Sequence, residues 1–211
     1  MGRVLCLVMG YVFGLFQTGY LYGKMNHIDI RNYGSGNSGT TNALRVLGKK
    51  AGLIVFAGDF LKTVFACLAA RIIFKASPDT DLYVLYAGLG VVLGHNFPCY
   101  LHFKGGKGIA SMAGILVSMD WRVTLVCAAL FLGAVIITRY VSLGSILVVI
   151  SFFIQILVYG AHGTFTVSAD HLMEFYVVAF VLMAMAIWRH KTNIKRLLSG
   201  TENKLWGGKK N

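Results

Sequence analysis

The chain has 211 residues, of which 56% are hydrophobic and only 13% are charged. Soluble domains carry about 25% charged residues, so this composition excludes an ordinary soluble domain and indicates an integral membrane protein. The formal net charge of +12 would suggest nucleic acid as the partner of a soluble chain. In a membrane protein, orientation and anionic ligands explain it better, so we expect no nucleic acid partner.

Seven apolar segments predict an all-α integral membrane protein with about seven transmembrane helices, folded as one polytopic membrane domain over residues 1–211. Several segments are shorter than the ~20 residues that cross a bilayer upright. The first has no convincing small-residue cleavage site at its end, so we expect it to remain as a span. The segments cover residues 4–23, 51–73, 82–97, 108–119, 123–138, 141–161 and 172–188.

Basic residues concentrate in every second polar stretch between these segments, and only four lie in the opposite set. The positive-inside rule assigns the basic stretches to the cytoplasm, which places the N-terminus outside and the C-terminus in the cytoplasm. The expected cytoplasmic loops are about 24–50, 98–108, 139–142 and 189–211.

The first of these loops contains a glycine-rich run over residues 34–42, Gly-Ser-Gly-Asn-Ser-Gly-Thr-Thr-Asn. The run matches the Gly-x-Gly-x-x-Gly dinucleotide fingerprint, but that fingerprint needs a preceding strand and a βαβ unit, whereas a predicted span precedes it here. We therefore reject a dinucleotide site. The backbone N–H groups and hydroxyls of the run instead offer a cradle for an anion.

We predict a short helix after this run, with Thr41 or Asn42 as its N-cap, Gly48 at its end and Arg45 in its first turn. A cation in a first turn opposes the helix dipole, so a bound anion explains Arg45 better than helix stability does. The alternative is a flexible loop in which Arg45 meets lipid phosphates.

The second loop joins two lysines and three glycines at the predicted start of a helix, Lys104-Gly105-Gly106-Lys107-Gly108. Free N–H groups and positive charge make it a candidate for a second phosphate. It is not a Walker A loop, because Gly108 rather than Ser or Thr follows Lys107. The alternative is a basic interfacial loop anchored by aromatic side chains.

Two pairs of residues stand three apart in the later loops. Arg139 and Ser142 would share a face if their loop is helical, and His190 and Asn193 would share one in the tail. Each pair could point at one ligand. The alternatives are an arginine that reaches lipid headgroups and an amphipathic basic tail on the membrane surface.

Polar residues and glycines also occur inside the apolar segments. Asp59 and Lys62 are costly in lipid, so they either pair structurally or contact a ligand. Gly-x-x-x-Gly patterns that start at Gly10 and Gly90 predict close helix packing. The four cysteines show no Cys-x-x-Cys spacing, so we expect buried free thiols, no disulfide framework and no metal site.

The sequence lacks several known catalytic motifs, and their absence limits the possible reaction types. The sequence has no His-Glu-x-x-His motif and no Gly-x-Ser-x-Gly elbow. None of the six histidines begins the His-x4-Asp pair that serves many CoA-dependent glycerolipid acyltransferases. Backbone donors, Ser, Asn, Lys and Arg without an evident base or nucleophile suit substrates that already carry their leaving group.

The loops together resemble the bacterial acyl-phosphate:glycerol-3-phosphate acyltransferase family, PlsY. Three motifs carry the resemblance, in an order and spacing that span nearly the whole chain. They are Ser-Gly-Asn-x-Gly-x-Thr-Asn over 35–42, Gly-His-x-Phe-Pro with Phe-Lys-Gly-Gly-Lys-Gly over 94–108, and His190-x-x-Asn193-Ile-x-Arg196.

The resemblance implies a seven-helix enzyme of the bacterial plasma (inner) membrane, with its N-terminus outside and its active site facing the cytoplasm. It implies transfer of a fatty acyl group from acyl phosphate to the 1-hydroxyl of glycerol 3-phosphate. The products are lysophosphatidic acid and phosphate, in the first step of phospholipid synthesis. The expected partners are both substrates and membrane lipid, with no cofactor, and we expect a monomer.

Carried over residue by residue, the resemblance implies catalytic roles for His190, Asn193 and Ser142, and no metal ligand. The phosphate-binding residues that it implies are Ser35, Asn37, Thr41, Asn42, Arg45, Lys104, Gly105, Gly106, Lys107, Gly108 and Arg139.

We expect the phosphate oxygen of the acyl phosphate to accept the hydroxyl proton, with His190 or a water as the alternative base. Two other functions stay open on the sequence. A small transporter or channel for a phosphorylated metabolite would suit the intramembrane Asp59 and Lys62. An acyl-CoA-dependent enzyme with the same acceptor is the second.

Overall fold

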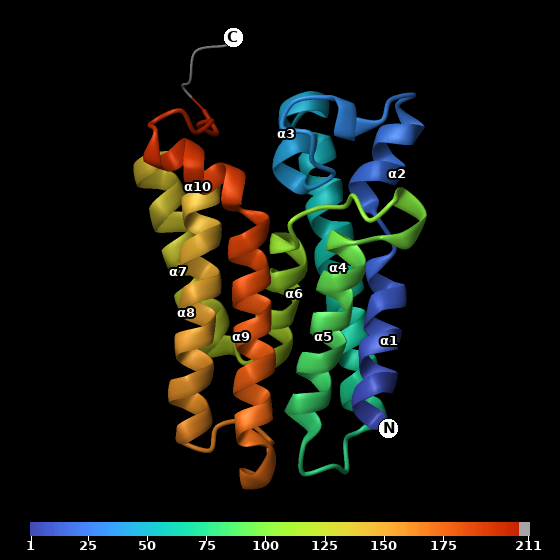
Figure 1. The fold of residues 1–211 in the computed structure, drawn as a ribbon, viewed down its shortest axis with the longest axis vertical. Coiled ribbons are helices and arrows are strands. Elements are labelled where there is room, and N and C mark those ends of the chain that lie inside the picture. The colour runs from blue at the N-terminus through green and yellow to red at the C-terminus, as the bar shows by residue number, and fades with distance from the viewer. Residues whose placement is uncertain (207–211) are drawn as a thin grey trace.

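Figure 1 shows the computed structural model of the protein, which describes residues 1–206. These residues contain α-helices, three short 3-10 turns and no strand, which confirms the all-α prediction. The turns are η1 (Ile30–Asn32), η2 (Cys99–Leu101) and η3 (Ala169–His171). The helices are α1 (Gly2–Gly14), α2 (Thr18–Met25), α3 (Thr40–Leu47), α4 (Lys49–Ile73), α5 (Thr80–Asn96), α6 (Ile109–Met119), α7 (Trp121–Thr138), α8 (Val141–Ala161), α9 (Leu172–Arg189) and α10 (Lys191–Leu198).

Six helical stretches within residues 1–206 are long and apolar enough to cross a membrane. The first, Gly2–Met25, contains α1 and α2. The predicted segment over 108–119 corresponds to α6, which has only 11 residues. At ~1.5 Å per residue it extends about half the thickness of a hydrocarbon core. The described chain thus has six long apolar stretches and one short apolar helix.

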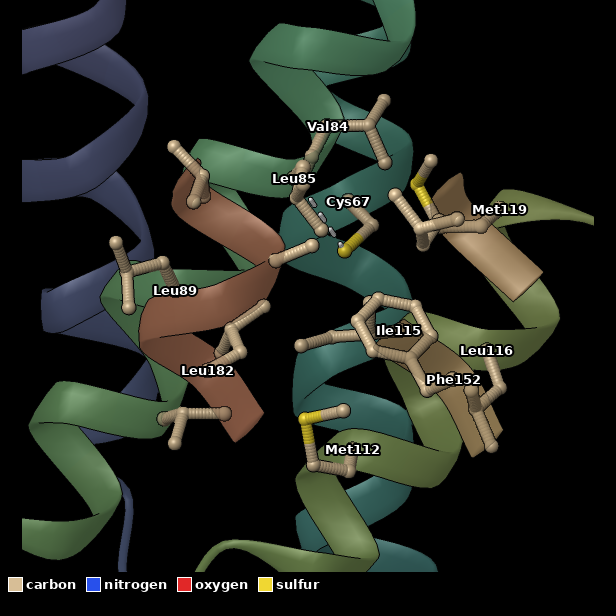
Figure 2. Packing of buried hydrophobic residues seen from close by; sticks show 14 of the residues in the cluster. Cys67, Val84, Leu85, Leu89, Met112, Ile115, Leu116, Met119, Phe152 and Leu182 are labelled. Atoms are coloured by element: carbon tan, nitrogen blue, oxygen red, sulfur yellow. Dashed lines mark hydrogen bonds between the residues drawn. The ribbon is translucent and has the colours of Figure 1, made fainter. Parts of the chain in front are cut away.

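The short helix α6 is buried inside the bundle. Met112 and Ile115 are fully buried in the main hydrophobic cluster. Figure 2 shows them with Leu85 of α5, Phe152 of α8 and Leu182 of α9. Because these side chains pack against protein rather than lipid, α6 does not need the length of a lipid-facing span.

The backbones of α1 and α5 approach closely at the two Gly-x-x-x-Gly patterns. A Cβ added at Gly10 would lie 2.1 Å from the carbonyl oxygen of Ala87, and one added at Gly90 would lie 2.2 Å from that of Leu7. Any side chain at either position would clash with the partner backbone. The predicted close packing is confirmed.

The two ends of the bundle differ in chemistry. The basic loops lie at the upper end in Figure 1, together with α3 and α10. The N-terminus lies at the lower end, where Arg3 pairs with Glu174 at 2.5 Å and Arg71 pairs with Asp81 at 2.8 Å. The last five residues of the predicted tail, 207–211, lie outside the described part of the chain.

The predicted start of the short helix is wrong. Helix α3 begins at Thr40, with Gly39 in extended conformation as its N-cap, rather than after Thr41 or Asn42. Arg45 therefore lies in the last turn, where a cation favours the helix dipole. The dipole argument for an anion beside Arg45 fails for this reason. Gly48 ends the helix with a positive φ of 87°, as predicted.

Two further expectations differ from the structure. Arg139 ends α7 in a left-handed conformation with φ 65°, whereas Ser142 lies in the first turn of α8. The two residues do not share a helical face, because the chain changes direction between them. Cys99 is exposed, although the other three cysteines are buried as expected.

Candidate active site

A cavity of about 270 Å³ lies among the basic loops. Four helices contribute residues of their first turns to its lining: Thr40 of α3, Ile109 of α6, Ser142 of α8 and Asn193 of α10. The N–H groups of a first turn have no partners within the helix, and the helix dipole makes this end positive. Four such ends around one cavity form a site for anions.

Two hydroxyls at these helix starts are free to bind a ligand. The Oγ1 atom of Thr40 and the Oγ atom of Ser142 are buried and have no hydrogen-bond partner within residues 1–206. Buried polar groups are nearly always hydrogen-bonded. Both hydroxyls therefore suit contact with a polar ligand in the cavity.

The side chain of Asn42 holds the glycine-rich run in its curved shape. Its Oδ1 atom accepts hydrogen bonds from the backbone N–H of Ser35 at 2.8 Å and from the Ser35 hydroxyl at 3.2 Å. Its Nδ2 atom donates to the carbonyls of Tyr33 and Asn37, at 3.0 and 2.8 Å. A Cβ at Gly34, where φ is 60°, would lie 2.4 Å from the same Oδ1 atom. Asn42 thus shapes the anion cradle and offers no free donor of its own.

Two cations line the cavity, Arg45 and Lys107. Arg45 donates to the carbonyl of Asn203 at 3.3 Å. Arg45 is exposed as a whole, but partial desolvation of its guanidinium lowers its pKa, and an arginine stays charged at neutral pH. Burial also lowers the pKa of Lys107 to about 8, and nearby arginines add to this effect. Lys107 is therefore still largely protonated at neutral pH.

A chain of polar contacts fixes Lys107 against α10. The Lys107 ammonium donates to the Oδ1 atom of Asn193. The Nδ2 atom of Asn193 donates to Glu202 at 2.9 Å, and Arg196 donates to the other oxygen of Glu202 at 2.8 Å. Glu202 thus fixes the orientation of the Asn193 amide, so that its oxygen faces Lys107.

His190 lies beside this chain with one free ring nitrogen. Its Nδ1 atom lies 2.7 Å from the carbonyl of Ala186, which can only accept, so Nδ1 carries the proton and Nε2 has the lone pair. Burial, with a smaller contribution from the Lys107 charge, lowers the pKa of His190 to about 4. The imidazole is therefore neutral at physiological pH.

Part of the cavity lining is apolar. Phe56 of α4 contributes to this part together with Phe131 and Val135 of α7. The cavity therefore joins an anion-binding end to a wall suited to a hydrocarbon chain.

Asp59 and Lys62 form the predicted structural pair. Their side chains meet at 2.8 Å, and Thr18 also donates to Asp59 at 3.1 Å. Asp59 lines the cavity as well. The pair is buried in protein, which removes the cost of exposing either charge to lipid.

Most of the predicted site residues meet at this cavity. His190, the N-cap of α10, and Asn193, in the first turn of α10, both line the cavity. The predicted residues in the lining are Ser35, Asn37, Thr41, Asn42, Arg45, Lys107, Gly108, Ser142, His190 and Asn193.

Four predicted residues lie outside the lining. The side chain of Lys104 is exposed. The carbonyls of Gly105 and Gly106 accept hydrogen bonds from Arg189 at 3.0 and 2.7 Å. The carbonyl of Arg139 accepts from the backbone N–H of Leu205 at 2.8 Å. The phosphate contacts expected of Lys104, Gly105, Gly106 and Arg139 stay predictions.

The sequence reasoning missed several residues of the cavity. Glu202 could have been found, because it is the single acidic residue in the basic tail over 189–211. His95 belongs to the Gly-His-x-Phe-Pro motif, but whether its side chain reaches the cavity depends on how α5 packs. The apolar wall gave no signal, because Phe56 and Phe131 resemble any lipid-facing residue of a span.

The chain matches known proteins along nearly its whole length. The family model described as glycerol-3-phosphate acyltransferase matches residues 4–200. The glycerol-3-phosphate acyltransferase of Clostridioides difficile (strain 630) is 42% identical over 207 residues, which cover 96% of this chain and 95% of that protein. The enzyme of the same name from Thermoanaerobacter sp. (strain X514) is 39% identical over 206 residues, covering 97% and 96%.

Two crystal structures of PlsY (YgiH), an integral membrane glycerol 3-phosphate acyltransferase, have the same fold. The glycerol 3-phosphate form has a TM-score of 0.84 and 37% identity, and covers 98% of this chain and 96% of that one. The lysophosphatidic acid form has a TM-score of 0.81 and 36% identity, with coverages of 97% and 95%. The chain therefore belongs to the PlsY family of glycerol-3-phosphate acyltransferases.

Proposed function

We propose that this enzyme transfers a fatty acyl group from acyl phosphate to the 1-hydroxyl of glycerol 3-phosphate. The products are lysophosphatidic acid and inorganic phosphate. The observation that carries the proposal is the convergence of four helix N-termini, Arg45 and Lys107 on a cavity with an apolar wall. Such a cavity suits phosphate groups at one side and an acyl chain at the other. The ligand forms of the two similar PlsY structures support the same acceptor and product.

The reaction needs two phosphate groups in one small site. Their mutual repulsion is offset by Arg45, Lys107 and the first-turn N–H groups. Each hydrogen bond to a charged group contributes roughly 1.5 to 3 kcal/mol. The site therefore works mainly by holding acceptor and donor side by side.

In the proposed step, the 1-hydroxyl oxygen of glycerol 3-phosphate attacks the carbonyl carbon of the acyl phosphate. A new ester bond forms, the bond between the carbonyl carbon and the phosphate oxygen breaks, and phosphate leaves. We propose that an oxygen of this phosphate accepts the hydroxyl proton. No bond to the protein forms during the transfer.

The environment of His190 favours this substrate-assisted route over a histidine base. A general base works best when its pKa lies near the working pH. The pKa of His190 is lowered to about 4, which makes its Nε2 atom a weak base, whereas the phosphate becomes more basic as its bond to the carbonyl carbon breaks. His190 can still hold a ligand hydroxyl through its free Nε2 atom.

We further propose that the cavity faces the cytoplasm in a bacterial plasma membrane, with the N-terminus outside. The basic loops gather at the cavity end, as the positive-inside rule requires of cytoplasmic loops. At the other end, Glu174 pairs with Arg3 and Asp81 pairs with Arg71.

The donor is tested with purified protein in lipid, supplied with glycerol 3-phosphate and either acyl phosphate or acyl-CoA. Lysophosphatidic acid and free phosphate are measured together. We expect one phosphate for each lysophosphatidic acid from acyl phosphate, and no product from acyl-CoA. Product formed from acyl-CoA alone would contradict the proposed donor. Uptake of glycerol 3-phosphate into vesicles without any acylated product would favour a transporter instead.

A further inference from the structure

His95 lies deep in the protein yet reaches the cavity. It is 3% exposed, occupies the last turn of α5 and belongs to the cavity lining. Its Nδ1 atom lies 3.0 Å from the Nζ atom of Lys62. Its two ring nitrogens therefore face different surroundings, and the surroundings of each decide which one carries the proton.

Lys62 decides the tautomer of His95. Its Nζ atom lies 2.8 Å from the Asp59 carboxylate, 2.7 Å from the Phe16 carbonyl and 3.0 Å from the Nδ1 atom of His95. The Gly14 carbonyl is a fourth, more distant acceptor at 3.4 Å. An ammonium group has three N–H donors and no acceptor. A proton on Nδ1 would face the ammonium hydrogens at 3.0 Å with nothing on Lys62 to accept it, so Nδ1 accepts and the proton of the neutral imidazole lies on Nε2.

The Nε2 atom points toward Gly106, in the glycine-rich loop that precedes α6. A Cβ added at Gly106 would lie 2.0 Å from Nε2, closer than from any other atom of the ring. Within residues 1–206 no acceptor forms a hydrogen bond with this nitrogen. The carbonyl of Gly106 itself accepts from Arg189 at 2.7 Å. Because position 106 is a glycine, no side chain of that residue covers the Nε2–H group, and His95 lines the cavity together with Lys107.

We propose that His95 is a substrate-contacting residue that donates its Nε2–H to an oxyanion in the cavity. This inference rests on the proposed function. The oxyanion is an oxygen of a substrate phosphate or the carbonyl oxygen that gains negative charge during acyl transfer. Lys62 and Asp59 act as positioning residues, because they fix the tautomer that supplies the donor.

Two substitutions separate the roles of the two ring nitrogens. In His95→Asn, the amide oxygen can take the place of Nδ1 and accept from Lys62, but the donor toward Gly106 is lost. In His95→Gln, the amide nitrogen can reach the place of Nε2 and donate. The same two substitutions at His162, an exposed residue outside the cavity, serve as matched controls.

The experiment measures acyl transfer from acyl phosphate by the wild type and all four variants, with thermal midpoints recorded in the same lipid. We expect His95→Asn to lose at least ~10-fold in kcat/KM, and His95→Gln to keep most of the activity. A rise in KM for one substrate assigns the oxyanion to the phosphate of that substrate. A fall in kcat with both KM values unchanged assigns it to the reacting carbonyl.

Near-normal activity of His95→Asn, or a larger loss in His95→Gln than in His95→Asn, would overturn the inference. If the wild type makes no product, the proposed function is contradicted instead. If His95→Asn fails to fold, NMR of the wild type with nitrogen-15-labelled histidine shows which ring nitrogen of His95 carries the proton. The inference requires the proton of His95 on Nε2 and a shift of that signal on addition of glycerol 3-phosphate or of acyl phosphate, and a proton on Nδ1 refutes it.

Discussion

At the scale of single residues, the side chains around the cavity have two kinds of role. Some shape the loops of the site, and others remain available to a ligand. Asn42 uses both amide atoms on the loop around it. Arg45 and Lys107 instead present charge to the cavity. Loss of a shaping residue should act through folding of the loop, whereas loss of a charge should act on substrate affinity and turnover.

Arg45 provides the first test of this division. Arg45→Ala removes a charged contact, so we expect kcat/KM to fall at least ~10-fold, equivalent to about 1.4 kcal/mol. Arg45→Lys should recover part of the loss, because it restores charge without the planar fork. Lys50→Ala, an exposed basic residue at the start of α4, is the control and should remain within ~2-fold of wild type. Equal rates for Arg45→Ala and Lys50→Ala would show that Arg45 meets lipid rather than substrate.

The lowered pKa of Lys107 predicts how the activity depends on pH. Burial lowers its pKa from 10.5 to about 8, so it loses its proton as the pH rises through about 8. Lys107 binds phosphate as a cation below that pH and as a neutral amine above it. We expect kcat/KM for glycerol 3-phosphate to fall above pH 8, by up to ~10-fold per pH unit if this charge is essential.

Lys107→Arg is the matched variant for the pH profile, because a guanidinium stays charged throughout this range. Its kcat/KM should stay level where that of the wild type falls. Superimposable profiles of the two proteins between pH 7 and 10 would rule out Lys107 as the titrating group.

At the scale of secondary-structure elements, the sequence predicted positions better than boundaries. The Gly-x-x-x-Gly patterns predicted close helix packing, because small residues let backbones approach, and the structure shows this packing between α1 and α5. The start of α3 could not be predicted, because Gly39, Thr40, Thr41 and Asn42 can all cap a helix. In the structure the Asn42 amide forms hydrogen bonds with the glycine-rich loop instead of capping the helix. No local sequence pattern predicts this contact.

The glycines of α5 and α7 provide the test at this scale. A Cβ at Gly90 would lie 2.2 Å from the Leu7 carbonyl, whereas one at Gly133 meets nothing within 4 Å. Gly90→Ala should therefore destabilise the protein by ~1–3 kcal/mol through overpacking. Gly133→Ala should leave stability unchanged or slightly raised. Thermal unfolding in one lipid mixture measures both, and equal midpoints would contradict the close contact of α1 with α5.

At the scale of the whole molecule, the basic loops and the cavity lie together at one end of the helix bundle. The charge distribution in the sequence predicted this grouping, because loops on one side of a membrane must meet in space. It could not predict which members reach the cavity. Lys107 lines it and Lys104 does not, although both stand in the same glycine-rich loop. Their separation follows from Asn193 and Glu202, which hold Lys107 from a distant part of the chain.

The most direct test of the account asks at which end of the molecule acyl transfer takes place. The protein is reconstituted into sealed vesicles, and the fraction with an outward-facing C-terminal tail is measured by protease cleavage. Glycerol 3-phosphate and acyl phosphate are then added outside only. We predict that lysophosphatidic acid forms in proportion to the tail-outward fraction, and that permeabilisation raises it to the total. Product in proportion to the tail-inward fraction would contradict the assignment of the reaction to this cavity.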